Sequence, residues 1–202
     1  GLKHLTLKGN IMDFALLFDE FPNKIIPYDY PAYAACKERF EMVTTSCQTG
    51  KACYYEEMES PERIIDIVRA SSALPFACPI AQVDGRAMLD GGIADSIPID
   101  RAFDQGYEHA IVVLTRHLGY RKEEKSPHLP PFIYSRYPKL REALRTRGKR
   151  YNAQLERVEQ LEREGRITVI RPDHPVEVAR IETDMDKMNA LYRHAFEMAE
   201  RV

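Results

Sequence analysis

The sequence lacks several motifs that would assign an enzyme class, because its ten glycines and six histidines are unfavourably spaced. No two glycines lie four residues apart, which excludes the Gly-x-Ser-x-Gly nucleophile elbow of serine hydrolases within this chain. The glycine spacing also excludes a phosphate-binding P-loop and a Gly-x-Gly dinucleotide fingerprint. No two histidines lie four residues apart, so the helical zinc-protease motif is missing as well.

Cysteine is scarce, and long apolar runs are missing. Four scattered cysteines are too few for a disulfide scaffold, and the spacing of Cys47 and Cys53 is not that of metal ligands. No run approaches the roughly 18 apolar residues of a membrane helix, and residues 1–10 lack the apolar core of a signal peptide. We therefore expect a cytoplasmic protein with reduced cysteines. The opening at Gly1, with no obvious start of a fold, fits a chain cut from a longer one.

Charge is nearly balanced overall but uneven along the chain. Lysine and arginine total 29 against 31 aspartates and glutamates, which gives no general attraction to nucleic acid or anionic membrane. One segment is strongly basic and contains a single acidic residue, Glu142. Its basic residues are Arg136, Lys139, Arg141, Arg145, Arg147, Lys149 and Arg150. This segment is a candidate for peripheral contact with lipid headgroups, and a solvated helix face is the plainer alternative.

The pattern of apolar and turn residues predicts alternating strands and helices, and hence an α/β protein. Asp84-Gly85 predicts a hairpin turn that leads to Asp90, and Ser60-Pro61 predicts a helix start. The apolar run 110–115 is typical of a strand buried on both faces, as in a parallel sheet. Residues 1–35 predict an irregular or partly helical lead-in. Strands are predicted over 40–47, 52–56, 80–83, 87–89, 110–115 and 167–170. Helices are predicted over 61–69, 98–105, 137–164 and 184–201.

Two neighbouring segments carry a resemblance to a known family. The first is Ala70-Ser-Ser-Ala-Leu-Pro-Phe76, and the second is Leu89-Asp-Gly-Gly-Ile-Ala-Asp-Ser-Ile-Pro98. Together they resemble the C-terminal half of the catalytic domain of bacterial patatin-like phospholipases, and the resemblance extends loosely over residues 40–200. It implies a three-layer α/β/α domain, of which residues 1–125 would be the C-terminal portion. Residues 126–202 would be a helical extension that packs on this portion and includes one short strand.

The resemblance also implies a mechanism and half of a site. The family cleaves lipid or small ester substrates with a Ser–Asp dyad and needs no metal or cofactor. Asp90 matches the family's aspartate, and Gly91 and Gly92 complete its motif, whereas the serine and the oxyanion loop are missing from this chain. An ordinary aspartate, with a pKa of about 3.9, is a weak base for serine, and burial would improve the match. Gly91 and Gly92 would allow a sharp turn and a close approach to substrate.

Other residues offer alternatives to this assignment. Asp90 before two glycines could be a plain turn residue. Asp95 is a rival carboxylate, although its place before the helix at Pro98 favours a turn or capping role. Ser71 and Ser72 lack elbow glycines, which favours a structural role. His117 or His128 could serve a hydrolase outside the family.

The sequence thus predicts part of a lipid acyl hydrolase that is inactive on its own. The alternative is a noncatalytic binding module or a degenerate family member. A chain without the first strands of its domain should expose sheet edges and apolar surface, so self-association is expected.

Overall fold

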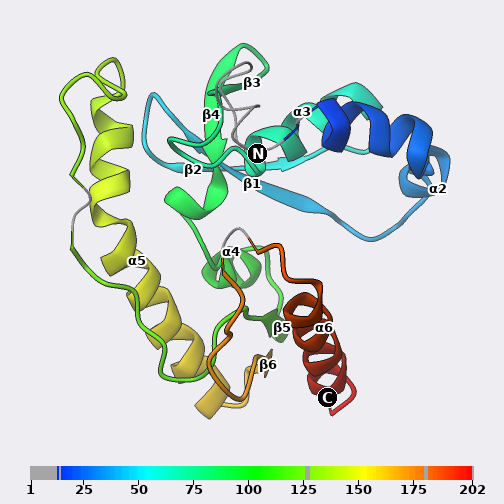
Figure 1. The fold of residues 1–202 in the computed structure, drawn as a ribbon, viewed down its shortest axis with the longest axis vertical. Helices are drawn as coiled ribbons and strands as arrows, with labels where there is room; N and C mark the ends of the chain where they lie inside the picture. The colour runs from blue at the N-terminus through cyan, green and yellow to red at the C-terminus, as the bar shows by residue number, and fades with distance from the viewer. Residues whose placement is uncertain (1–12, 14, 126–127, 180–181, 202) are drawn as a thin grey trace. The chain divides into compact units, whose positions relative to one another are not determined.

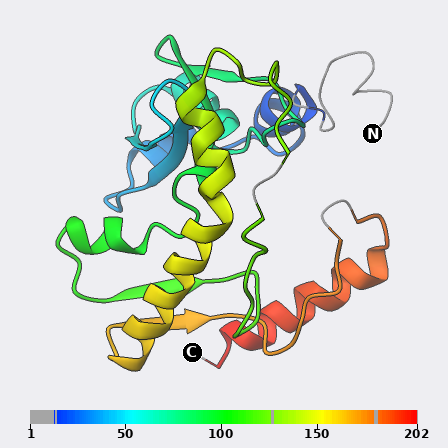
Figure 2. The ribbon, with the colours of Figure 1, turned by 90° about the vertical axis from the view of Figure 1, so that its left-hand side faces the viewer.

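The computed structural model describes residues 13, 15–125, 128–179 and 182–201 (Figure 1). The chain forms two compact units. Unit 1 combines residues up to 96 with residues 124–150, and unit 2 combines 97–123 with the residues from 151 onward. Neither unit ends at the expected boundary after residue 125, because helix α5 (Pro138–Arg163) contributes its first half to unit 1 and its second half to unit 2 (Figure 2). Where the family's catalytic domain ends therefore stays a prediction.

Unit 1 is built on a four-stranded antiparallel sheet in the order β2-β1-β4-β3. Strands β1 (Glu41–Ser46) and β2 (Ala52–Glu56) form the first predicted hairpin. Strands β3 (Ala81–Val83) and β4 (Arg86–Asp90) form the second. Its turn uses positive φ angles at Asp84 and Gly85, which confirms the turn predicted from those two residues. The lead-in of unit 1 contains the helices η1 (Leu16–Ile25) and α2 (Tyr30–Ala34).

Helices cover both faces of this sheet. Helix α3 (Pro61–Ser71) begins as predicted, because the Ser60 hydroxyl accepts the backbone N–H of Arg63 at 3.2 Å. Its residue Ile67 shares a core with Met88 of β4, whereas the neighbouring Leu89 shares a second core with α5. Successive residues of a strand point to opposite faces, so α3 and the first half of α5 lie on opposite faces of the sheet. The predicted α/β class is confirmed, and unit 1 has a helix, sheet, helix layering.

Unit 2 pairs strands β5 (Ala110–Val113) and β6 (Ile167–Ile170) in parallel, as the apolar run suggested. Helix α4 (Ile99–Asp104) and the second half of α5 contribute to a core around Val112. Burial of β5 on both faces was a wrong prediction, since Ile111 and Val113 are 66% and 69% exposed and Val112 is 9% exposed. The physical reason is that the core of this two-stranded sheet lies on the Val112 side only. Helix α6 (Met185–Ala199) ends the unit.

Apolar side chains are exposed in both units, as expected. In unit 1, Phe40 and Phe132 are exposed. In unit 2 the exposed apolar residues include Ile111, Val113, Tyr192 and Phe196. The expected self-association through such surface stays a prediction. None of the helices among the described residues combines the length and apolarity needed to cross a bilayer.

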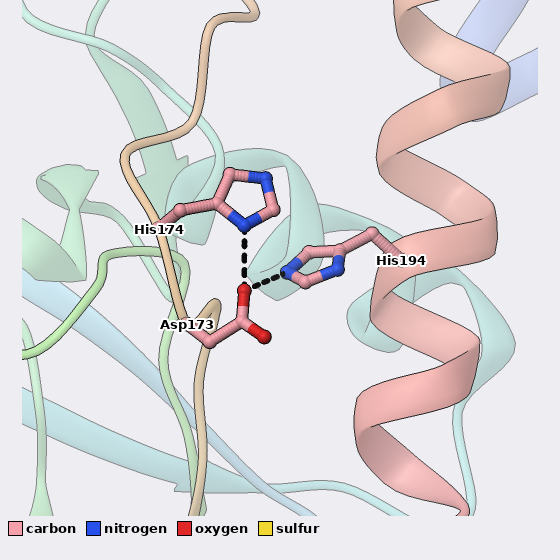
Figure 3. Close-up of side chains that lie close together, drawn as sticks. All are labelled: Asp173, His174 and His194. Carbon is pink, nitrogen blue, oxygen red and sulfur yellow. Dashed lines mark hydrogen bonds and ion pairs between the residues drawn. The ribbon is translucent and has the colours of Figure 1, made fainter.

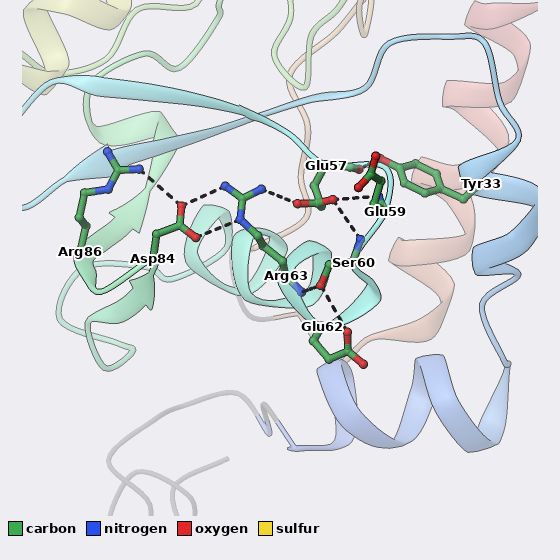
Figure 4. A network of polar contacts seen from close by, with 8 residues as sticks. All are labelled: Tyr33, Glu57, Glu59, Ser60, Glu62, Arg63, Asp84 and Arg86. Atoms are coloured by element: carbon green, nitrogen blue, oxygen red, sulfur yellow. Dashed lines mark hydrogen bonds and ion pairs between the residues drawn. The ribbon is translucent and has the colours of Figure 1, made fainter.

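A polar network ties the start of α3 to the β3–β4 turn in unit 1 (Figure 4). The Arg63 guanidinium donates to both carboxylate oxygens of Asp84 at 2.9 Å and to Glu57 at 2.5 Å. The Glu57 carboxylate also accepts the backbone N–H groups of Glu59 and Ser60. The two backbone hydrogen bonds, and then Arg63, lower the pKa of Glu57 to about 2. The network therefore requires an ionised Glu57.

This network makes the stability of unit 1 depend on pH. A depressed carboxylate pKa stabilises the fold above the unfolded value near 4.5, and the contribution disappears as pH falls toward 2. We expect Glu57→Gln to lower the free energy of unfolding by about 2 kcal/mol at pH 7, with the difference shrinking below pH 4.5. Urea unfolding at pH 7, 4 and 3 measures this. Glu59→Gln, an exposed carboxylate of the same loop, is the control, and equal pH dependence of both variants would contradict the assignment.

Candidate active site

Asp90 is the last residue of β4, at the point where the strand turns into a short helical turn, η2 (Gly91–Ile93). Its backbone N–H donates to the carbonyl of Ala73 at 3.0 Å, which joins it to the loop after α3. Its carboxylate accepts the N–H of Gly92 at 2.6 Å. Asp90 therefore does cap a turn, as the plainer interpretation held. A carboxylate has about four acceptor sites, so capping is compatible with a second role as a base.

Gly91 allows this turn to pack directly on β1. A side-chain carbon at Gly91 would lie 2.3 Å from the carbonyl oxygen of Val43 and 2.6 Å from its carbonyl carbon. No such contact is tolerated, and both atoms belong to the backbone of a central strand. The close approach at Gly91 is thus made to β1, and the approach to substrate expected for the two glycines stays a prediction. At Gly92 a side chain would lie 3.0 Å from the Asp90 carboxylate.

A buried threonine of β1 holds the backbone on either side of the turn. The Thr45 hydroxyl donates to the carbonyl of Asp90 at 2.8 Å and accepts the N–H of Ala94 at 3.2 Å. Thr45 is fully buried, so these hydrogen bonds are shielded from water. The backbone that carries Asp90 is therefore fixed from both ends.

Two arginines of α5 also form hydrogen bonds with the backbone of the Asp90 turn. Arg147 donates to the carbonyl of Gly92 at 2.7 Å, and Arg150 donates to the carbonyl of Ile93 at 2.8 Å. The Ser96 hydroxyl also donates to the carbonyl of Gly92, at 2.7 Å. The carbonyl groups of η2 thus receive charged donors, which form stronger hydrogen bonds than neutral ones.

The basic segment is therefore only partly a surface feature. Arg147 and Arg150 bond to η2, and Arg141 donates to the carbonyls of Leu129 and Pro130 at 3.0 and 2.8 Å. The exposed members are Arg136, Lys139, Arg145 and Lys149. Contact with lipid headgroups stays a prediction, and these four residues are the ones that it concerns.

The residues considered as alternatives to Asp90 make contacts of their own. The Asp95 carboxylate accepts the hydroxyl of Tyr54 at 2.5 Å, and α4 begins after Pro98 without a side-chain cap, so the capping alternative for Asp95 was wrong. The backbone N–H of Asp95 donates to the carbonyl of Gly91 at 2.9 Å, which fits the other alternative, a turn role. The Ser71 hydroxyl donates to the carbonyl of Val43 at 2.7 Å, which fits its expected structural role. His128 is exposed, whereas His117 is half-buried, with its Nδ1 2.7 Å from the carbonyl oxygen of Leu118.

Sequence reasoning did not find Thr45, Ser96 or Arg147 as parts of this site. In the sequence, Thr45 has the properties of an ordinary β-branched strand residue. Arg147 is one of seven basic residues in the segment 136–150. Both act through contacts with residues 45 to 55 positions away in the chain. Local sequence patterns do not predict contacts between residues so far apart in the chain.

Two family models match separate parts of the chain. Residues 34–103, which include Asp90, Gly91 and Gly92, match the family described as patatin-like phospholipase. Residues 137–202 match a domain of unknown function, DUF6363. The uncharacterized protein YjjU of Escherichia coli (strain K12) is 42% identical over 52 residues, which are 25% of this chain and 15% of that protein. The aligned region is thus a small part of that relative.

Proposed function

Because residues 34–103 are a patatin-like phospholipase segment, we propose that the chain is part of a lipid acyl hydrolase and supplies its catalytic base, Asp90. The substrate would be a lipid or a small ester. The nucleophile would be a serine that these 202 residues do not supply, since they contain no Gly-x-Ser-x-Gly elbow.

In this mechanism Asp90 accepts the proton of the serine hydroxyl while the serine oxygen attacks the ester carbonyl. The tetrahedral intermediate collapses to an acyl-enzyme, and the proton held by Asp90 passes to the departing alkoxide. Water then attacks the acyl-enzyme, gives a proton to Asp90 and releases the carboxylic acid. The proton returns to the serine, and Asp90 is again ionised.

The observation that carries this proposal is the rigid placement of Asp90 at a strand end. Its carboxylate is oriented by the N–H of Gly92, and its backbone is held by Ala73 and Thr45. A base must keep its position to within a fraction of an ångström while a proton moves. A plain surface turn needs no such support from a strand, a loop and a helix.

The first test compares the 202-residue chain with the full-length gene product that contains it. We expect the full-length protein to hydrolyse short-chain esters, and the 202-residue chain alone to show no turnover above the uncatalysed rate. If the chain alone hydrolyses esters and this activity depends on Asp90, the proposal that the nucleophile lies outside these 202 residues is contradicted. A full-length protein that hydrolyses none of a panel of esters would favour the noncatalytic binding module.

A further inference from the structure

A second cluster of reactive side chains lies in unit 2, separate from the Asp90 turn (Figure 3). Asp173 and His174 lie in the segment after β6, and His194 lies on α6. One carboxylate oxygen of Asp173 is 2.5 Å from Nδ1 of His174 and 3.2 Å from Nε2 of His194. The two imidazole rings are 4.3 Å apart, and one potential ligand atom from each residue lies within 4.8 Å of the other two.

His194 has an unsatisfied polar atom in this cluster. Its side chain is 16% exposed, and its Nε2 is shielded from solvent. Within the part of the chain that the structure describes, Nε2 has no hydrogen-bond partner, although the Asp173 oxygen lies 3.2 Å away. A buried polar nitrogen without a hydrogen bond is unfavourable, so such atoms usually have an additional ligand.

We propose that Asp173, His174 and His194 bind a divalent transition-metal ion of the zinc type. Two imidazoles and one carboxylate are a ligand set that zinc accepts, with bonds of about 2.0–2.2 Å. Tetrahedral ligands at that distance stand about 3.3 Å from one another. The 3.2 Å separation already fits, and the 2.5 Å pair must open slightly. Asp173 and His174 are 52% and 65% exposed, so the ion has access from solvent.

The charges around the cluster are compatible with a cation. An ordinary aspartate, with a pKa of about 3.9, is ionised at neutral pH, so Asp173 can supply an anionic ligand oxygen. Arg201 is the competing cation, with its guanidinium 3.8 Å from the second oxygen of Asp173. Its side chain is 62% exposed and is free to turn into solvent when a metal binds.

The ion would join α6 to the segment after β6. None of the described α6 residues is fully buried, so packing alone holds this helix weakly. His194 also lines an apolar cavity of about 460 Å³ in unit 2, with Val113, Ile170, Leu191 and Met198 among its other walls. A metal at His194 would fix one wall of that cavity. Metal binding is therefore expected to order α6 as well as to occupy the cluster.

The test is a titration of zinc chloride into the metal-stripped 202-residue chain, followed by calorimetry. We expect one ion per chain, and at least about a tenfold loss of affinity in His174→Ala and in His194→Ala. His109→Ala, which removes an exposed histidine of unit 2 outside the cluster, should bind as the parent does. Cobalt provides a second readout, because its visible absorption reports the coordination geometry.

Two results would overturn the site. One is the absence of binding at one ion per chain. The other is undiminished affinity in His174→Ala, whose side chain is exposed and whose loss does not threaten the fold. The zinc titration contains no step that depends on ester hydrolysis, so it is independent of the proposed enzyme activity.

Discussion

Gly91→Ala is expected to destabilise unit 1 by about 3 kcal/mol, although it adds a single methyl group. The added carbon would lie 2.3 Å from the Val43 carbonyl oxygen and 2.9 Å from the Val43 Cβ. Relief requires β1 to move away from the turn, and β1 is paired on both sides, with β2 and with β4. The same movement would stretch the Thr45 hydrogen bond to Asp90, which is 2.8 Å. Urea unfolding followed by circular dichroism measures the change.

Gly85→Ala is the matched control for this prediction. Gly85 lies in the β3–β4 turn of the same unit, has a φ of +71°, and has open space around the position of an added carbon. Its substitution brings only the penalty of a left-handed backbone, about 1 kcal/mol. If Gly91→Ala is no more destabilising than Gly85→Ala, the close packing of the Asp90 turn on β1 is not as described.

Asp90→Asn in the full-length gene product is expected to reduce ester hydrolysis by about 10²- to 10⁴-fold. The amide has the shape of the carboxylate, and its oxygen can still accept the N–H of Gly92, so the turn should persist. An amide cannot take the proton of a serine hydroxyl at neutral pH. The substitution therefore separates the capping role of Asp90 from its role as a base.

Asp95→Asn provides the control for the loss of a nearby carboxylate. Asp95 lies five residues beyond Asp90, and its side chain accepts the hydroxyl of Tyr54. An asparagine oxygen can accept the same hydrogen bond. We expect this variant to keep activity within a few-fold of the parent. A loss as large as that of Asp90→Asn would make Asp95 the better candidate for the base.

Local signals were sufficient for most of the elements. The hairpin around Asp84-Gly85 and the start of α3 at Ser60-Pro61 were predicted because turn residues and helix caps act through neighbours in the sequence. The long apolar stripe likewise placed α5 to within one residue at each end. The Asp90-Gly91-Gly92 motif was found by its local pattern together with the family resemblance.

Long-range contacts account for what the sequence could not predict. An apolar run shows that a strand prefers burial but not which layers are present, so the exposed face of β5 at Ile111 and Val113 was missed. The periodicity of α5 gave its apolar side, but not that Arg147 and Arg150 bond to η2. His194 meets Asp173 only because α6 folds back on the segment after β6, and no spacing rule covers that pair.

The most direct test of the central claim is kcat/KM for a short-chain ester, measured in the full-length parent, in Asp90→Asn and in Asp95→Asn. Circular dichroism should first establish that all three are equally folded. The account predicts a loss of two or more orders of magnitude in Asp90→Asn and nearly parental activity in Asp95→Asn. Parental activity in a folded Asp90→Asn variant would contradict it, and Asp90 would then be a turn residue in a fold whose chemistry lies elsewhere.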